Sequence, residues 1–197
     1  AYWGSDPVLD IFSNCESLSK TLEPRQGLAT ADNDSFLRLW AEVSYEKIGL
    51  GFATNSDANE SGKKWFPIDK GGEFRRWYGN QTHLVNWKSG GRQLKAFERS
   101  MIRNEANYFL DGVTWTAISS SLLSVRRTGP GNIFSNAGMK VFAEKPDRLL
   151  LGNGFLNSAV CRFLVSCLSQ TLNFDQGIIA HLPLKKDFSH SDVVVEL

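Results

Sequence analysis

A segment that mixes basic and aromatic side chains offers the most specific chemistry in this sequence of 197 residues. Between residues 63 and 80, lysines and arginines alternate with Trp, Phe and Tyr. Basic side chains neutralise phosphates and release counterions, which produces an affinity that falls as salt rises. Arginine can also pair with the O6 and N7 atoms of guanine, and asparagine with the edge of adenine. The segment therefore indicates a nucleic-acid surface, with the candidate contact residues Lys63, Lys64, Lys70, Arg75, Arg76 and Asn80.

Charge is distributed unevenly along the chain, although its net value is only +1. Residues 1–60 contain 4 Lys/Arg and 10 Asp/Glu, residues 61–103 contain 10 and 3, and residues 104–197 contain 8 of each. A basic block inside a nearly neutral chain favours a polyanion on one face, and a solvated surface explains the charge equally well. We expect residues 63–103 to form one positive surface, which adds Lys88 and Arg92 to the candidates.

Two further groups of residues near this block have two explanations each. Aromatic side chains are more often core residues than platforms for bases, so we expect Trp65, Phe66, Trp77 and Tyr78 in the core. Arg126 and Arg127 precede a turn, where contact with phosphate and contact with solvent are equally good explanations.

Signatures of catalysis and of metal binding are weak. The three histidines fit no metal-ligand spacing, no Gly-x-Gly-x-x-Gly follows a predicted strand, and the three cysteines form no Cys-x-x-Cys pair. We expect thiols in a reducing cytoplasm and no metal or cofactor in this chain. The acidic residues Asp32, Asp34 and Glu42 could bind Mg²⁺ in a nuclease fragment, but the Pro-Asp…Glu-x-Lys pattern of many restriction nucleases is missing.

The elements that must position these residues are mostly short strands. Alternation and turn residues predict strands at 36–43, 63–67, 84–87, 112–116, 122–127 and 131–135, and extended segments at 170–174 and 178–184. Apolar spacing predicts helices at 91–103 and 149–168, with a turn at 70–73 and a loop at 53–62. The prediction is an α+β fold with a twisted, mainly antiparallel sheet and a few helices.

The ends of the chain suggest a larger context. Residues 1–26 are polar and read as a connecting segment, and the abrupt start suggests a piece of a longer polypeptide. No stretch approaches the roughly 18 apolar residues of a membrane span, so we expect no membrane contact.

Several motifs resemble those of a known family. The segment from Gly27 to Trp40, Gly-Leu-Ala-Thr-Ala-Asp-Asn-Asp-Ser-Phe-Leu-Arg-Leu-Trp, resembles the stretch after the catalytic domain of BREX-type (phage-exclusion) N6-adenine-specific DNA methyltransferases. The blocks 64–80 and 113–119 resemble their next two signatures, and 149–158 with 171–184 resembles the helix and closing strand of target-recognition domains. One departure is Ala31, where the family usually has Gly, which would matter if that turn needs a positive φ.

The resemblance implies a role as well as a fold. Residues 27–197 would be the DNA target-recognition domain of an N6-adenine methyltransferase in a phage-defence or restriction–modification system. Double-stranded DNA would be the partner, and Asn33 and Arg38 would approach it. The catalytic domain would lie in cis and bind S-adenosylmethionine, because no two of the six prolines are adjacent and the Asn/Asp-Pro-Pro-Tyr/Phe loop is therefore absent. A metal-dependent nuclease fragment and a protein-interaction module that binds other subunits of a defence complex stay open as alternatives.

Overall fold

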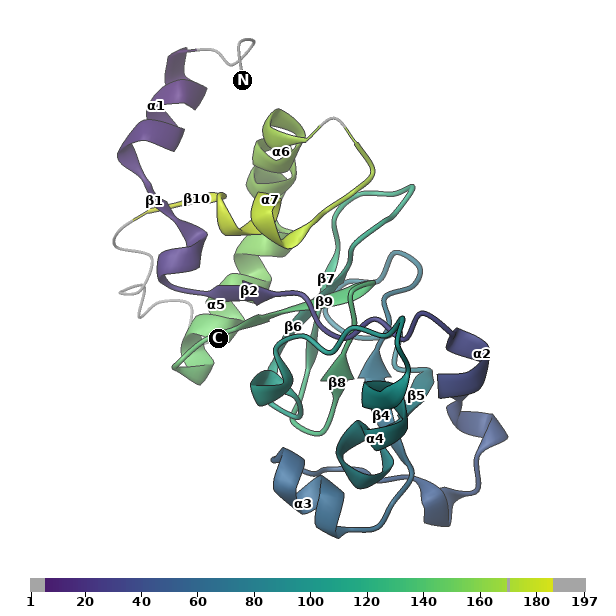
Figure 1. Ribbon diagram of the computed structural model, residues 1–197. Helices are drawn as coiled ribbons and strands as arrows, with labels where there is room; N and C mark the ends of the chain where they lie inside the picture. The colour runs from purple at the N-terminus through teal and green to yellow at the C-terminus, as the bar shows by residue number, and fades with distance from the viewer. Residues whose placement is uncertain (1–5, 170, 186–197) are drawn as a thin grey trace.

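The computed structural model describes residues 6–169 and 171–185 and has the predicted α+β fold (Figure 1). Its strands form two four-stranded sheets, β2-β9-β6-β7 and β3-β5-β4-β8, and the short pair β1-β10. Every pairing between strands is antiparallel except that of β4 with β8. The expectation of mainly antiparallel pairing is confirmed, with the strands divided among several sheets.

The first sheet is covered by helices. Its central strand β9 is buried at all five positions and pairs with β2 on one side and β6 on the other. Aliphatic side chains of β6, β7 and β9 pack on the helices that follow them, around the fully buried Trp115. This sheet and its helices form one half of the molecule, which we call the first half. Its elements are β2 (Glu23–Arg25), β6 (Gly112–Thr116), β7 (Val125–Thr128), β9 (Gly138–Phe142), α5 (Pro146–Asn157), α6 (Ala159–Leu168) and α7 (Gln176–Ala180).

The second sheet has an aromatic core. Phe66 of β4 and Val85 of β5 are directly opposite each other and completely buried, and Phe66 meets the ring of Phe109 edge-on at 5.7 Å. Such edge-to-face pairs add to the energy of apolar burial. The elements of this half are β3 (Leu37–Leu39), β4 (Trp65–Asp69), β5 (His83–Asn86), β8 (Ile133–Phe134), α2 (Asn33–Phe36), α3 (Asn55–Glu60), α4 (Lys88–Ala96), and the 3₁₀ helices η2 (Trp40–Glu42), η3 (Tyr45–Lys47) and η4 (Glu105–Asn107).

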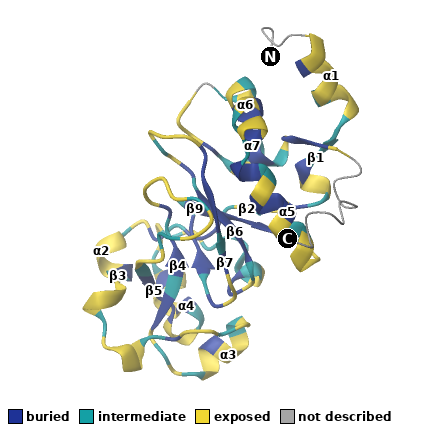
Figure 2. Ribbon diagram, turned by 180° about the vertical axis from the view of Figure 1, so that it is seen from behind, coloured by how far each residue is buried: buried dark blue, intermediate teal, exposed yellow. Residues whose placement is uncertain are grey.

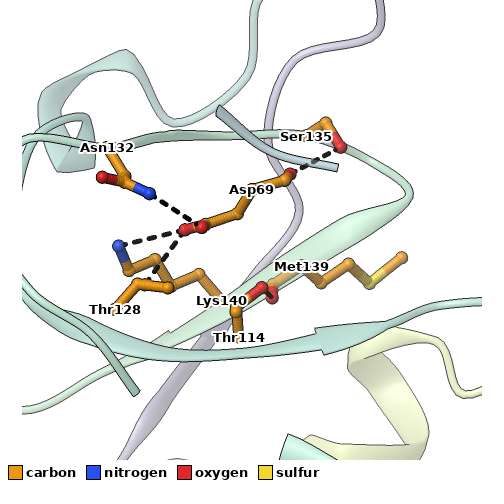
Figure 3. Close-up of polar contacts among 7 residues, drawn as sticks. All are labelled: Asp69, Thr114, Thr128, Asn132, Ser135, Met139 and Lys140. Atoms are coloured by element: carbon orange, nitrogen blue, oxygen red, sulfur yellow. Dashed lines mark hydrogen bonds and ion pairs between the residues drawn. The ribbon is translucent and has the colours of Figure 1, made fainter. Parts of the chain in front are cut away.

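A buried carboxylate joins the two halves (Figure 3). Asp69, the last residue of β4, accepts hydrogen bonds from Thr128 Oγ1 of β7 at 3.1 Å and from Asn132 Nδ2 at 3.0 Å. Lys140 Nζ of β9 lies 3.3 Å from Asp69 Oδ2, as an ion pair without hydrogen-bond geometry, and both side chains are at most 2% exposed. Asp69 O accepts further bonds from the backbone and side chain of Ser135. Asp69 therefore links the end of β4 to β7, to β9 and to the residues on either side of β8.

Several predicted elements differ from those observed. The helix expected at 149–168 is two helices, α5 and α6, at an angle of 70°, because Ser158 leaves the helical conformation and its side chain caps α6. Three segments are shorter or change class: the strand at 36–43 is reduced to β3, the helix at 91–103 ends at Ala96, and the extended segment at 178–184 contains the end of α7. The loop at 53–62 contains α3, and β9 was missed altogether.

The described part of the predicted connecting segment has structure of its own. It contains α1 (Asp6–Asn14), β1 (Glu16–Ser17), η1 (Leu18–Lys20) and β2, and β1 pairs with β10 (Pro183–Leu184). Leu18 and Leu22 are completely buried in the core of the first half. Residues 18–25 therefore contribute to the fold, a role that their polar neighbours concealed. Among the described helices none is by itself long and apolar enough to cross a membrane, and only α5 and α6 taken as a bent pair reach that length and composition.

The linking role of Asp69 predicts a large effect of its removal. Asp69→Ala should lower the free energy of unfolding by about 3–5 kcal/mol, because it leaves the buried Lys140 without its counter-charge. Urea unfolding followed by circular dichroism measures this. The control is Asp111→Ala, whose ion pair with Arg127 is partly exposed and should contribute roughly 1 kcal/mol or less. Equal effects of the two variants would contradict the role assigned to Asp69.

Candidate nucleic-acid interface

The loop between β4 and β5 displays several of the basic and aromatic residues singled out above. We call residues 70–82 the β4–β5 loop. It begins with the predicted turn, in which Gly71 and Gly72 have φ values of +84° and +138°. A Cβ atom on Gly71 would lie 2.8 Å from the carbonyl oxygen of Ala137, so only glycine fits there.

The β4–β5 loop is fixed to the first sheet and does not hang free. Trp77 N donates to Val125 O and Arg127 N donates to Trp77 O, both at 3.0 Å, so that Trp77 extends the edge of β7. The hydroxyl of Thr116 donates to Gly72 O, and Asn80 Nδ2 closes the loop on Glu73 O at 2.8 Å. A loop held in this way loses little conformational entropy when a ligand binds.

The anchored loop presents its side chains outward. Arg75 is exposed and has no hydrogen-bond or ion-pair partner among the residues that the structure describes. Arg76 is partly buried and lies over the ring of Phe74 at 5.2 Å. Trp77 and Tyr78 are 55% and 71% exposed, so the expectation that they belong to the core is wrong. The same expectation is confirmed for the other two aromatic residues of the block, Trp65 and Phe66.

Asn80 has a structural task that limits its use as a base reader. Its φ is +59°, and its side-chain amide nitrogen already donates to Glu73 O. Paired hydrogen bonds to adenine require one amide N–H and the amide oxygen. Asn80 therefore shapes the loop with one N–H, and its second N–H and its oxygen are the groups left for the predicted contact with adenine.

Beside the loop, residues from two distant segments of the chain meet. Asn33 Oδ1 accepts hydrogen bonds from Thr30 Oγ1 at 2.6 Å and from Lys70 Nζ at 3.2 Å. The oxygen of the Asn33 amide is thereby occupied, while its nitrogen has no partner within the described chain. Burial lowers the pKa of Lys70 from its ordinary value. The turn that brings Asn33 here passes through Ala31 at a φ of +56°, in the left-handed region that favours glycine.

Arg38 lies on the other side of the same hollow. Its guanidinium donates to the carbonyl oxygens of Asp34 and Leu37 and stacks on the ring of Trp65 at 5.4 Å. The hollow has a volume of about 340 Å³ and is lined by Asn33, Asp34, Leu37, Arg38, Leu39, Glu42, Lys70 and His83. We call it the polar hollow. The structure thus brings the predicted residues Asn33, Arg38 and Lys70 together.

The remaining cations of the block lie at the far end of the hairpin. Lys63 and Lys64 precede β4, and Lys88 and Arg92 follow β5, whereas the β4–β5 loop joins the opposite ends of these strands. Five strand residues separate the two groups by about 15 Å. Lys63 Nζ is bound to Glu46 O, Lys64 lies over Trp65, and Lys88 and Arg92 are exposed on α4. The expectation of one compact positive surface over residues 63–103 therefore needs correction, because the hairpin divides the cations into two groups.

The arginine pair of β7 also divides. Arg126 is 1% exposed, and its guanidinium donates to Thr116 Oγ1 at 3.3 Å. Burial lowers its pKa, and the nearby Asp69 opposes that shift. The predicted surface contact of Arg126 with phosphate is wrong, because in a strand the side chains of successive residues point to opposite faces and this one points inward. Arg127 points outward and forms an ion pair with Asp111 at 2.8 Å.

Two of the three acidic residues considered for a metal have other tasks. The Asp32 carboxylate caps α2 by accepting bonds from the backbone and hydroxyl of Ser35, which lower its pKa. Glu42 accepts from the backbone of Leu39 at 2.7 Å. Within residues 6–169 and 171–185, no cluster of three or more His, Cys, Asp or Glu side chains could hold a metal ion. The nuclease alternative therefore gains no support.

Two residues of the site, Asp69 and His83, are absent from the predicted site residues although the sequence contains a signal for each. Asp69 ends a strand of apolar residues, Trp-Phe-Pro-Ile-Asp, and a charged residue in that position indicates either a strand end or a buried partner. His83 fits no metal-ligand spacing in the sequence, but it lines the polar hollow from β5. Neither the contacts of His83 nor the depth at which it is buried could be derived from the spacing of residues in the sequence, since both depend on the pairing of β4 with β5.

Comparison with known proteins gives two relatives and no matching family model. The chain is 37% identical over 206 aligned positions to the adenine-specific methyltransferase PglX of Lacticaseibacillus casei (strain Zhang), an alignment that covers all of this chain and 17% of that protein. It is 34% identical over 193 positions to the adenine-specific methyltransferase BrxX of Escherichia coli O9:H4 (strain HS), covering 95% of this chain and 15% of that protein. The chain therefore spans about a sixth of the length of the curated relatives it matches.

The positive φ of Ala31 predicts a stabilising substitution. A left-handed conformation costs a residue with a Cβ about 1–2 kcal/mol, and the extra freedom of glycine in the unfolded chain offsets part of that gain. Ala31→Gly should therefore raise the free energy of unfolding by about 0.5–1 kcal/mol in urea titrations. Ala41→Gly is the matched control in η2, where φ is not positive, and it should lower that energy. A loss of stability in both variants would show that the turn at Ala31 is not strained.

Proposed function

We propose that this chain is the DNA target-recognition domain of an N6-adenine-specific DNA methyltransferase from a phage-defence or restriction–modification system. Both relatives are named adenine-specific methyltransferases, and the similarity runs along all or nearly all of this chain. An enzyme that modifies one base in a duplex must hold the double helix and select a site before the base leaves the stack. This chain would carry out that selection.

The observation that carries the proposal is the anchored β4–β5 loop beside the polar hollow. The loop offers Arg75, which has no partner within the described chain, together with Arg76 and the exposed rings of Trp77 and Tyr78. Lys70 connects the loop to Asn33, and Arg38 lies across the same hollow. Arginines on a rigid loop suit the reading of guanine in the major groove, while Lys70 and Arg38 suit the phosphates that position the duplex.

The second group of cations would extend the footprint. Lys64 and Arg38 lie over the ring of the same residue, Trp65, and Arg38 also lines the polar hollow with Lys70, so basic groups run from one end of the hairpin towards the other. A row of this kind fits the phosphates of one strand of a duplex better than a compact anion. Lys88 and Arg92 would then contact the backbone beyond the recognised bases, which adds affinity without sequence preference.

Methyl transfer would belong to another part of the polypeptide. The Asn/Asp-Pro-Pro-Tyr/Phe loop and a glycine-rich turn for S-adenosylmethionine are missing from this chain. In this proposal the catalytic domain lies in cis, binds the cofactor and receives the flipped adenine. Other subunits of a defence complex and a cytoplasmic location belong to the same proposal.

A salt titration tests DNA binding directly. Removing Arg75 and Arg76 together, as Arg75→Gln with Arg76→Gln, should reduce the slope of log affinity against log salt by about 0.9 for each phosphate that the chain no longer neutralises. If these arginines contact bases, affinity should instead fall by about 1–3 kcal/mol per residue with the slope unchanged. Fluorescence anisotropy with duplex DNA over a salt series measures both quantities.

The control for this experiment removes equal charge elsewhere. Lys145→Gln with Arg148→Gln changes two cations at the start of α5, on the helical side of the other sheet, and should leave affinity and slope close to those of the unaltered chain. Duplex binding that does not depend on salt, or an equal decrease of affinity in both double variants, would contradict the assignment of the β4–β5 loop.

A separate observation favours contact with the remainder of a longer polypeptide. Apolar side chains of α6 and of two neighbouring loops are 39–73% exposed, and residues 113–125 contain no charge. Ser119 N donates to Leu172 O, so the two loops lie side by side next to α6 (Figure 2). Exposed apolar side chains that gather on neighbouring elements often mark a contact with another protein surface. We call this the apolar end, and its exposed residues are Ile118, Leu122, Val160, Phe163, Leu168 and Leu172.

This contact predicts different effects in short and long polypeptides. Phe163→Ser should change the melting temperature of the present chain little, because the side chain is 55% exposed. In a polypeptide of the relatives' length, the same change should accelerate limited proteolysis around this domain, since it removes an apolar contact worth about 1.5–3 kcal/mol when fully buried. Met101→Ser, 48% exposed and outside the apolar end, is the control. Identical proteolysis of both variants would show that the apolar end stays in solvent.

A further inference from the structure

A second hollow opens on the same sheet, lined by exposed aromatic and aliphatic side chains. It has a volume of about 410 Å³ and lies between residues 40–51 and the Gly131–Asn132 turn. Trp40, Tyr45 and Leu50 on its rim are 61%, 78% and 51% exposed. We call it the aromatic groove, and its lining residues include Trp40, Tyr45, Pro67, Gln81, His83 and Asn132.

The aromatic side chains of the groove project from a fixed backbone and have no ring partner among the described residues. Neither Trp40 nor Tyr45 has a ring contact within the described chain. Their backbone is nevertheless fixed, because Trp40 N donates to Thr82 O at 3.1 Å and Gly49 N donates to Trp65 O at 2.8 Å. Exposed rings on a fixed backbone beside a concave surface are suited to a flat ligand, since little entropy is lost when that ligand covers them.

The rim of the groove offers a small set of hydrogen-bonding groups. The amide oxygen of Gln81 accepts from Tyr78, which leaves its nitrogen as a donor. Asn132 donates its nitrogen to Asp69, which leaves its oxygen as an acceptor. Burial and the charge of Lys70 lower the pKa of His83. Its imidazole ring is therefore neutral near pH 7, and its nitrogens can donate one hydrogen bond and accept another. Apolar walls with a few donors and acceptors are typical of sites for planar heterocycles.

The aromatic groove and the polar hollow are neighbours, because His83 lines both. On one side of His83 are rings, and on the other are the cations Lys70 and Arg38. This pairing of an apolar slot with adjacent cations matches a nucleotide, in which a flat base is joined to a phosphate. It does not match an apolar peptide segment, which would need no cation beside it.

We propose that the aromatic groove holds one unstacked base of the bound DNA, with the neighbouring phosphate at Lys70 and Arg38. This inference rests on the proposed function, because it takes DNA as the ligand. The base would stack on Trp40, with Tyr45 beside it on the rim, and the rim amides of Gln81 and Asn132 would meet its edge. Such a site would favour DNA in which a base has already left the helix.

The test compares two DNA probes that differ by one base. The affinity of the chain is measured for a fully paired 20-base-pair duplex and for the same duplex with one bulged, unpaired base. Base–aromatic stacking predicts preference for the bulged probe by about 5- to 100-fold. Trp40→Leu should abolish that preference and leave the salt slope unchanged, because stacking neutralises no phosphate. Trp40→Phe keeps a ring and should retain most of the preference.

The outcomes separate this inference from the function on which it rests. If both probes bind with salt-dependent affinity but Trp40→Leu has the same preference as the unaltered chain, the base site is wrong and DNA recognition stands. If neither probe binds with salt-dependent affinity, both proposals fail, and a protein partner becomes the better occupant of the groove. A melting temperature within a few degrees of the unaltered chain, expected for a residue that is 61% exposed, confirms that the variant folds.

Discussion

The position of the β4–β5 loop and of the second sheet relative to the first depends on the buried carboxylate of Asp69. One oxygen holds Asn132 and the other holds Thr128 and Lys140, while its carbonyl oxygen holds Ser135. Two cations, Lys140 and Arg126, are buried near this one negative charge. Burial of charge disfavours any arrangement in which these groups separate. The second sheet, with the polar hollow and the aromatic groove, therefore has a fixed orientation relative to the first sheet.

This constraint acts directly on the surface that faces a ligand. The β4–β5 loop begins at Lys70, one residue after Asp69, and returns to β7 at Trp77 next to Arg126. Asn132 connects the same carboxylate to the rim of the aromatic groove. Loops usually owe their mobility to a lack of such contacts. Here a buried polar cluster supports both the loop and the groove, which allows weak individual contacts to a duplex to act together.

The sequence predicted the class of fold and most strands of both sheets, because alternation and turn residues are local signals. It failed where tertiary structure decides. The strand β9, Gly-Met-Lys-Val-Phe, contains a lysine that only burial beside Asp69 explains. Ser158 ends one helix and caps the next within one continuous apolar pattern. Arg126 and Arg127 are adjacent residues of the same type, yet Arg126 is buried and Arg127 lies at the surface. Only the pairing of the strands decides this difference. Asn33, Arg38 and Lys70 were each predicted, but their meeting in one hollow depends on the packing of the second sheet.

Hydrogen–deuterium exchange with and without duplex DNA tests most directly whether the β4–β5 loop and the polar hollow form the surface against DNA. Backbone amides protected by a ligand exchange more slowly, and the method resolves segments of the chain. We expect duplex DNA to slow exchange in residues 70–82 and 31–39, with the apolar end unchanged. Protection confined to α6 and residues 118–122, or no protection of residues 70–82 at a DNA concentration that saturates binding, would contradict this assignment.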